Sequence, residues 1–236
     1  DEVTRVMSLA RETGLPLAVR SGGHSVAGHS VSEGGIVLDL SKMRDLQLDL
    51  EEQTAWAEAG LTAGEYTTAV AAHGLATGFG DTGSVGIGGL TLGGGVGYLV
   101  RKYGLTIDDL LAAEIVTADG NVARTDAQTN PDLFWAIRGG GGNFGVVTAF
   151  EFEAHPTTEV FYGKISFPAA ESATVLKGWA DHLRTAPEEL TATVELQNLF
   201  GTPAAQHKVS ANYTLSPYTP WFARYGDVDT AAAVLR

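Results

Sequence analysis

Residues 19–30 read VRSGGHSVAGHS and place two histidines, three glycines and three serines directly after a short apolar segment. The whole chain has only six histidines among its 236 residues. The presence of two of them, His24 and His29, in one glycine-rich run therefore needs an explanation. A metal site, an ordinary polar loop and a loop that contacts a ligand are the three alternatives.

A metal site is the weakest of these alternatives. His24 and His29 are five positions apart, a spacing that does not bring two side chains onto one helix face, and the glycines around them disfavour a helix. The chain has no cysteine and no His-Glu-x-x-His pattern, which removes the usual partners of a zinc site. We predict no metal, and the polar loop stays open as an interpretation.

Composition narrows the class of protein. The 15 basic and 28 acidic residues give a formal net charge of −13, which disfavours binding to a nucleic-acid backbone. An apolar fraction of 44% indicates a globular fold, and no apolar run approaches the roughly 20 residues of a membrane span. The chain opens on Asp1 without an initiator methionine, so the start looks trimmed. A trimmed start would hide a signal peptide, so the cellular compartment of the protein is left unassigned, with the cytoplasm slightly favoured.

Glycine is the outlier, with 30 residues in two dense clusters. Half of the positions from Gly80 to Gly97 are glycine, and the second cluster is Gly139 to Gly142, followed by Gly145. Because glycine loses the most backbone entropy on folding, such clusters predict unusual backbone angles or a ligand pressed against the main chain.

The hydrophobic patterns predict an α+β fold with antiparallel sheet. A first helix carries apolar residues from Val3 to Ala10 and ends at Gly14, and a second starts after Thr62 with a capping box to Glu65 and ends at Gly74. Further helices are expected over residues 133–137 and 170–183. Strands are expected over residues 17–19, 36–40, 46–50, 54–58, 110–117, 121–124, 146–153, 160–167, 191–199 and 208–215.

Familiar nucleotide and hydrolase motifs do not fit. Residues 140–145 match G-x-G-x-x-G by letters, but a helix precedes them and a strand follows, which is the reverse of the Rossmann order. The chain has no phosphate-binding P-loop pattern. Ser84 lacks the Gly-x-Ser-x-Gly spacing of a nucleophile elbow, so a hydrolase is a weak alternative. Glycine-rich backbone can still hold a pyrophosphate through its N–H groups.

Three sequence blocks occur in a fixed order. They are VRSGGHS at residues 19–25, GSVGIGGLTLGGGVGY at residues 83–98, continuing into RKYGL at 101–105, and NPDLFWAIRGGGGNFGVVT at residues 130–148. Together they resemble the berberine-bridge-enzyme-like flavoproteins of the vanillyl-alcohol-oxidase superfamily. The resemblance spans roughly residues 1–155, is far more specific than any single glycine motif, and lowers the weight of the polar-loop interpretation.

The resemblance implies a PCMH-type FAD-binding domain of two α+β subdomains at residues 1–155, followed by part of an antiparallel-sheet substrate domain at residues 156–236. It implies that His24 is bonded covalently to the 8α-methyl carbon of FAD, and neutral imidazole is a suitable nucleophile near pH 7. On this interpretation Gly22 and Gly23 let the backbone close on the cofactor, and Ser21 and Ser25 donate to phosphate oxygens.

The resemblance also supplies a set of FAD-binding residues. They are Arg20, Ser21, Gly22, Gly23, His24, Ser25, Thr82, Gly83, Val85, Gly86, Gly88, Gly89, Thr91, Gly94, Gly97, Tyr98, Asn143, Gly145 and Val147. Many family members carry a second flavin-linking cysteine where this chain has Thr82, so attachment through His24 alone is expected. We expect Arg20 to order the loop rather than to touch substrate.

The chain departs from the family pattern at both ends. Within these 236 residues no proline-containing strand is expected before the first helix, and no Tyr-x-Asn-Tyr-type motif occurs, whose tyrosine is often the catalytic base in the family. The substrate domain is therefore expected to be incomplete and the catalytic base stays unassigned. Four residues keep two interpretations each: His29 and Asp81 as groups near the flavin or as loop residues, and Tyr98 and Tyr103 as substrate contacts or as core aromatics.

The function implied by the resemblance is an FAD-linked oxidoreductase acting on CH–OH or related donors. Hydride would pass from an alcohol, a sugar or an amine-type small molecule to flavin N5, and molecular oxygen or another acceptor would reoxidise the flavin. The alternative is a non-catalytic or degenerate flavin-binding module. The sequence does not predict the substrate, the oligomeric state, or whether the enzyme is an oxidase or a dehydrogenase.

Overall fold

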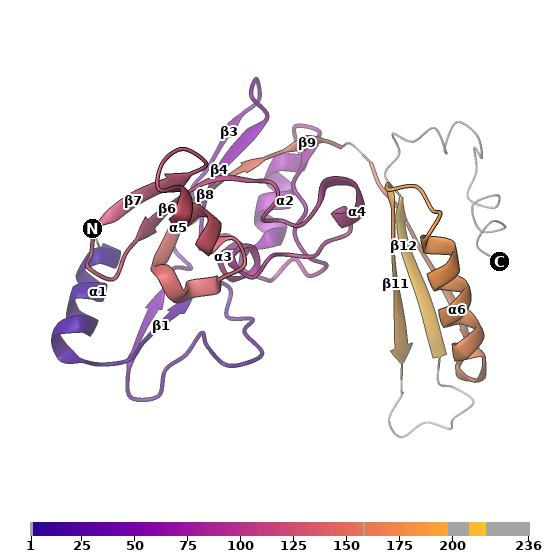
Figure 1. The fold of residues 1–236 in the computed structure, drawn as a ribbon, viewed down its shortest axis with the longest axis horizontal. Helices are drawn as coiled ribbons and strands as arrows, with labels where there is room; N and C mark the ends of the chain where they lie inside the picture. The colour runs from indigo at the N-terminus through magenta and orange to yellow at the C-terminus, as the bar shows by residue number, and fades with distance from the viewer. Residues whose placement is uncertain (1, 158, 198–207, 216–236) are drawn as a thin grey trace. The chain divides into compact units, whose positions relative to one another are not determined.

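The computed structural model describes residues 2–157, 159–197 and 208–215 (Figure 1). Contacts divide the chain into two compact units, Asp1–Pro156 and Thr157–Arg236. Both units combine helices with antiparallel sheet, so the predicted α+β class is confirmed. The finer division of the first unit into two subdomains stays a prediction.

The first unit is built on a five-stranded antiparallel sheet in the order β3-β4-β8-β6-β7. Its strands are β3 (Leu46–Asp49), β4 (Thr54–Glu58), β8 (Val146–Glu153), β6 (Leu110–Val116) and β7 (Val122–Asp126). β8 lies in the centre, and seven of its eight residues are buried or half-buried, as its nearly continuous apolar sequence predicts. The predicted β6–β7 hairpin is confirmed.

Helices and short strands surround this sheet. The helices are α1 (Glu2–Thr13), α2 (Ala63–Ala71), α3 (Ile87–Leu92), α4 (Val100–Tyr103) and α5 (Pro131–Ile137), with a 3-10 turn at Gly141–Phe144, and the strands are β1 (Leu17–Arg20), β2 (Ile36–Asp39), β5 (Leu75–Ala76) and β9 (His155–Pro156). The capping box predicted for Thr62 and Glu65 is present at the start of α2. Because it satisfies two N–H groups of the first turn, it fixes where α2 begins.

Aromatic side chains form the centre of the core. Tyr66 from α2 lies edge-on to Phe79 and Phe152, with ring centroids 4.6 and 5.8 Å away, and Phe150 stacks on Phe152. Tyr66, Phe150 and Phe152 are fully buried. The core therefore joins α2 to the central strand β8.

Two features of the first unit differ from the sequence-based expectation. β1 and β2 pair in parallel, which the antiparallel expectation did not include, because the long segment 21–35 between them can cross back along the pair. Helix α3 also forms inside the glycine-rich segment, where no helix was predicted. Its residues Ile87 and Thr91 are both fully buried, so tertiary packing outweighs the low helix propensity of glycine.

The second unit contains the antiparallel sheet β10-β12-β11 and one helix. Its elements are β10 (Phe161–Pro168), a 3-10 turn at Ala169–Glu171, α6 (Ser172–Leu183), β11 (Leu190–Gln197) and β12 (Lys208–Leu215). The expected strands and helix are found within two residues at each described end, while residues 198 and 199 of one predicted strand lie outside the described residues. No helix of the described residues is long and apolar enough to cross a membrane.

Candidate functional site

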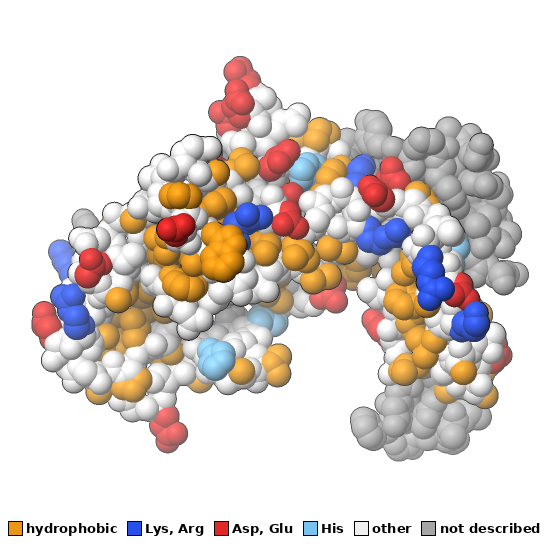
Figure 2. All heavy atoms as spheres, in the orientation of Figure 1, with side chains coloured by type: hydrophobic (Ala, Val, Ile, Leu, Met, Phe, Trp, Pro, Cys, Tyr) orange, Lys and Arg blue, Asp and Glu red, His pale blue; other side chains and the backbone are white. Residues whose placement is uncertain are grey.

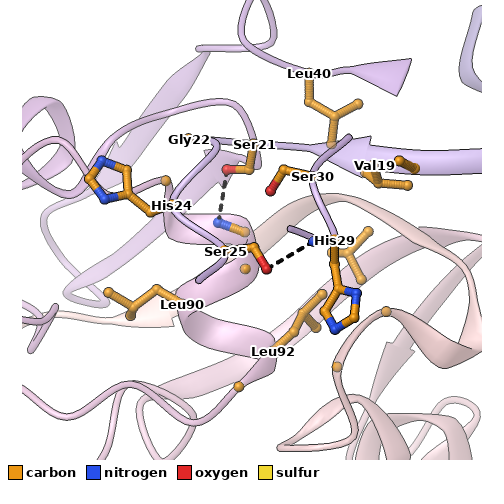
Figure 3. A pocket seen from close by; sticks show the side chains of 18 of the residues that line it. Val19, Ser21, Gly22, His24, Ser25, His29, Ser30, Leu40, Leu90 and Leu92 are labelled. Carbon is orange, nitrogen blue, oxygen red and sulfur yellow. Dashed lines mark hydrogen bonds between the residues drawn. The ribbon is translucent and has the colours of Figure 1, made fainter. Parts of the chain in front are cut away.

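A cavity of about 730 Å³ lies where three segments of the first unit meet. Residues from 17 to 30, from 85 to 93 and from 141 to 147 line it, together with Leu40. These segments contain parts of all three sequence blocks, so the fold gathers motifs more than 100 residues apart in the chain around one space (Figure 3). The volume lies within the usual range of about 300–1,000 Å³ for ligand sites.

The first loop is tied to the sheet through Ser21. Its Oγ donates to the carbonyl of Ala59 at 2.6 Å. It also accepts from the backbone N–H of Gly88 at 3.4 Å, a bond drawn in Figure 3. The Ser21 hydroxyl hydrogen is therefore used within the protein, which corrects the expectation that it donates to phosphate. Ser25 Oγ accepts from the His29 N–H at 3.1 Å, so its own hydrogen can still be donated to a ligand.

Gly22 and Gly86 explain why the first two blocks need glycine. A Cβ at Gly22 would overlap the backbone of Gly86, and a Cβ at Gly86 would overlap both the backbone of Gly22 and Ser21 Oγ. The missing side chain of Gly22 thus makes room for the neighbouring backbone of Gly86. Gly22 also lines the cavity, so the predicted close approach of its backbone to the cofactor stays a prediction. Gly23 has a positive φ of 73°, a conformation that glycine adopts without strain.

Gly89 and Gly142 show the opposite behaviour. Both line the cavity, and a Cβ at either would meet no atom within 4 Å. Neither has a positive φ, and Gly89 lies within α3, where alanine would be more stable by about 0.5–1 kcal/mol. Nothing within the described protein requires glycine here, so the space beside these two positions fits a bound group.

The cavity lining carries no Lys, Arg, Asp or Glu side chain among the described residues. Acidic groups gather elsewhere, for example Asp49, Glu51 and Glu52 at the tip of the β3–β4 hairpin (Figure 2). An anionic ligand in the cavity would therefore be met by backbone N–H groups, hydroxyls and two histidines. Such glycine-rich backbone is a known way to hold phosphate oxygens.

The two histidines of the first loop do not form a pair. Their rings point in different directions (Figure 3), and no group of metal-ligating residues exists among the described residues. His24 Nε2 lies 3.0 Å from Ser84 Oγ, which joins the first block to the second. His29, for which the sequence left two interpretations, lines the cavity.

The Ser84–His24 contact does not make a hydrolase triad. A nucleophilic serine of that kind needs a histidine whose other nitrogen is held by a third group. Across the described residues, no carboxylate lies within bonding distance of His24 Nδ1. The pair therefore orders two loops without the third member that hydrolysis requires.

The structure brings most of the predicted site residues to this cavity. Those that line it are Ser21, Gly22, Gly23, His24, Ser25, Val85, Gly86, Gly88, Gly89, Asn143, Gly145 and Val147. Those outside its lining are Arg20, Thr82, Gly83, Thr91, Gly94, Gly97 and Tyr98. The role of both sets in binding FAD stays a prediction.

Several residues outside the lining have visible structural roles. Arg20 lies 3.9 Å from Asp39, and a Cβ at Gly23 would lie 3.1 Å from its guanidinium, so Arg20 supports the first loop from behind. Gly97 packs against the backbone after Phe79, since a Cβ there would lie 3.1 Å from it. Thr91 is fully buried on the inner face of α3.

Two residues left open by the sequence, Asp81 and Tyr103, have local partners. Asp81 accepts from the Thr82 hydroxyl at 3.0 Å, which suits a loop residue. Tyr103 stacks on His155 with centroids 3.9 Å apart, and its hydroxyl donates to the carbonyl of Pro156. Neither Tyr98 nor Tyr103 is among the residues that line the cavity.

Sequence reasoning missed the apolar part of the lining. Leu40, Leu90 and Leu92 line the cavity beside the glycines. Leu90 and Leu92 stand between two glycine groups of the second block, and that position could have indicated a ligand contact. Leu40 follows β2 and carries no such local signal.

A cavity lined by glycine-rich backbone, hydroxyls and apolar side chains, without Lys, Arg, Asp or Glu, suits a cofactor with an anionic part and a flat apolar part. The family described as "FAD binding domain" matches residues 1–126. The Uncharacterized FAD-linked oxidoreductase YvdP of Bacillus subtilis (strain 168) is 40% identical over 199 residues, covering 83% of this chain and 44% of that protein.

Solved structures lead to the same class. The crystal structure of 6-hydroxy-D-nicotine oxidase from Arthrobacter nicotinovorans has a TM-score of 0.86 at 32% identity and covers 98% of this chain and 50% of its own. The BBE-like 1 protein of Physcomitrella patens gives 0.86 at 28% identity, with coverages of 98% and 50%. The chain spans about half the length of these relatives.

These relatives and the cavity define a flavoprotein class. The chain belongs to the FAD-linked oxidoreductases with an FAD-binding domain that include the berberine-bridge-enzyme-like proteins. The resemblance that the three blocks indicated is thereby confirmed.

Proposed function

We propose that the cavity holds FAD, attached through His24, and that the whole protein oxidises a small molecule. The observation that carries the proposal is the cavity itself, which is lined by glycines of all three sequence blocks and by the His24 ring, hydrogen-bonded to Ser84. The free space at Gly89 and Gly142 supports a bound group at that place.

The residues present suit the parts of FAD. The backbone of the first and second blocks and the Ser25 hydroxyl would face the pyrophosphate, and the leucines Leu40, Leu90 and Leu92 would pack against flat rings. Bound FAD supplies the capacity to accept two electrons from an organic donor and to pass them to an acceptor. The protein's own part is to position donor and cofactor and to exclude water.

The proposed donors are an alcohol, a sugar or a related small molecule with a CH–OH group, and the proposed acceptor is molecular oxygen. A family relationship to proteins named oxidoreductases and oxidases supports this reaction class. The catalytic base stays unassigned, since no titratable side chain other than His24 and His29 lines the cavity among the described residues.

The test of attachment uses the two histidines as a matched pair. Wild-type protein and the variants His24→Ala and His29→Ala are purified, denatured with acid and separated on a gel, and flavin fluorescence is read from the protein band. We expect fluorescence in wild type and His29→Ala and none in His24→Ala, which should still bind FAD reversibly. A fluorescent His24→Ala band would contradict the proposed linkage.

The alternative is a flavin-binding module without turnover. The two are distinguished by mixing the yellow protein with a panel of alcohols, sugars and amines under argon and recording absorbance. Bleaching that is reversed by air supports the oxidoreductase. Persistent colour with every donor supports the module, and a colourless protein that takes up no added FAD contradicts both.

A further inference from the structure

We propose that Ser84 is a positioning residue for the attachment of flavin, because it selects which nitrogen of His24 is free to react. The observation is the 3.0 Å contact between Ser84 Oγ and His24 Nε2. The inference rests on the proposed function, since it concerns the same covalent bond. It adds a residue of the second block to a step that the sequence assigned to the first block alone.

Ser84 is well placed for this role because its neighbours are fixed. The carbonyl of Gly83 accepts from the N–H of Gly64 at 2.8 Å, and the carbonyl of Val85 accepts from the N–H of Ala63 at 2.8 Å. Both donors belong to the first turn of α2, whose start is set by its capping box. The Ser84 hydroxyl is thus presented from a turn that is bonded on both sides.

The hydrogen bond decides the reactivity of the ring. Neutral imidazole has one N–H donor and one nitrogen with a free lone pair, and only the latter is a nucleophile. If the Nε2 hydrogen is donated to Ser84 Oγ, the lone pair lies on Nδ1. Ser84 then holds the ring in the reactive tautomer and also fixes its rotation, so that Nδ1 faces away from the second block.

The chemistry of attachment balances with this assignment. A bond forms between His24 Nδ1 and the 8α-methyl carbon of the flavin, and one C–H bond of that methyl group breaks. The electron pair of the C–H bond remains on the flavin ring, and two protons leave, one from the methyl group and one from Nε2. Dioxygen takes up the electron pair and two protons to give hydrogen peroxide.

Positive charge develops on the ring while the Nδ1–carbon bond forms. The Nε2–H group becomes a stronger donor as this happens, and its hydrogen bond to Ser84 Oγ strengthens. The hydrogen bond from His24 to Ser84 therefore stabilises the transition state of attachment more than it stabilises the unreacted histidine. Its removal should slow the attachment while leaving the reversible binding of FAD nearly unchanged, because the cavity lining does not include the Ser84 side chain.

The kinetic experiment compares Ser84→Thr with Ser84→Val, two variants of nearly equal shape that differ in the hydroxyl. Apoprotein from riboflavin-starved cells is mixed with FAD, and acid-stable fluorescence is followed with time beside the dissociation constant for reversible binding. We expect Ser84→Val to react about five- to tenfold more slowly than Ser84→Thr, as for the loss of one hydrogen bond of about 1 kcal/mol, with dissociation constants within about twofold. Equal rates would overturn the role of Ser84.

A second measurement needs no flavin. In apoprotein labelled with ¹⁵N-histidine, with His24→Ala used to assign the signal, the nitrogen shifts report which ring nitrogen carries hydrogen. We expect hydrogen on Nε2 in wild type and a mixture of tautomers in Ser84→Val. Hydrogen on Nδ1 in wild type would overturn the inference even if FAD binds. Failure of FAD to bind would instead contradict the proposed function, and the tautomer would still be decided.

Discussion

Gly22 and Gly86 lie back to back, so that a side chain on either one would enter the backbone of the other. The contact joins the loop after β1 to the segment that starts α3, and it is closed by Ser21, which bonds to Ala59 and Gly88. The shape of the cavity follows from this contact, because both segments form part of its lining. The two glycine blocks are therefore mutually dependent.

The first prediction is that Gly22→Ala and Gly86→Ala each separate the two segments. Relief of the overlap requires a backbone shift, which should lower the free energy of unfolding by about 1–3 kcal/mol and abolish tight FAD binding. Urea unfolding and FAD titration measure the two effects. The double variant should lose less stability than the sum of the two single losses, because one backbone shift relieves both overlaps. Additive losses would contradict the mutual contact.

Gly89→Ala should act in two opposite directions. The new methyl group meets no protein atom within 4 Å, and alanine favours the α3 helix, so the apoprotein should gain about 0.5–1 kcal/mol of stability. The same methyl group enters the space assigned to FAD and should weaken reversible binding about tenfold. Thermal unfolding without FAD and titration with FAD separate the two effects.

Gly178→Ala is the matched control for that variant. Gly178 lies within α6, and a Cβ there also meets nothing within 4 Å, but it does not line the cavity. It should stabilise its helix by a similar amount without changing FAD affinity. Weaker binding in both variants, or in neither, would contradict the assignment of FAD to the space at Gly89.

Acid should destabilise the protein through carboxyl groups that the fold keeps charged. The hydrogen bond from the Thr62 backbone N–H lowers the pKa of Glu65 below its usual value of 4.5. Backbone N–H groups of Thr129 and Gln128 lower the pKa of Asp126 below its usual value of 3.8. In acid the folded protein then binds fewer protons than the unfolded chain. The stability that these two carboxylates contribute is therefore complete above their usual pKa values and is lost as the pH falls through their lowered pKa values in the folded protein. Urea unfolding between pH 6 and about pH 3 measures the slope.

Glu65→Gln tests one part of this acid sensitivity. The amide keeps the shape of the capping box but cannot be protonated, so stability should be lower near neutral pH and should fall less steeply below about pH 4.5. Asp126→Asn should flatten the curve at lower pH. If the slope in either variant equals that of the wild type, the carboxyl group concerned is not a source of the acid sensitivity.

Local sequence signals were sufficient where the structure is determined by neighbours in the chain. The capping box of Thr62 and Glu65, the β6–β7 hairpin and the order of strands and helices follow from patterns within about ten residues. The α3 helix was not predictable in this way, since glycine disfavours a helix and only burial of Ile87 and Thr91 makes it form.

The candidate site was predictable by block but not by contact. Resemblance placed both glycine blocks near one cofactor, and their residues do line one cavity. The resemblance did not indicate that the backbones of Gly22 and Gly86 are in contact, or that His24 is hydrogen-bonded to Ser84, because both pairs are about 60 residues apart in sequence. Contacts of that separation depend on how β1, α2 and α3 pack, which no local pattern contains.

The last prediction concerns alkaline pH and Tyr66. Its hydroxyl donates to Thr77 Oγ1 at 2.8 Å, because the Thr77 hydrogen is given to the carbonyl of Glu153. Burial raises the pKa of Tyr66 far above its usual value of 10, and the nearby Asp109 adds to this shift. The folded protein therefore retains a proton that the unfolded chain loses, so this contribution to stability is complete below pH 10 and is lost as the pH rises.

Tyr66→Phe removes both the hydrogen bond and the titrating group. At pH 7 the variant should be less stable than wild type by about 1 kcal/mol, the usual net worth of one hydrogen bond. Between pH 10 and about pH 11.5 wild type should lose stability faster, so the difference should shrink and can reverse. Urea unfolding of both proteins at pH 7, 10 and 11.5 checks this. A constant difference across that range would mean that Tyr66 ionises as readily in the folded protein as in the unfolded chain, against its complete burial.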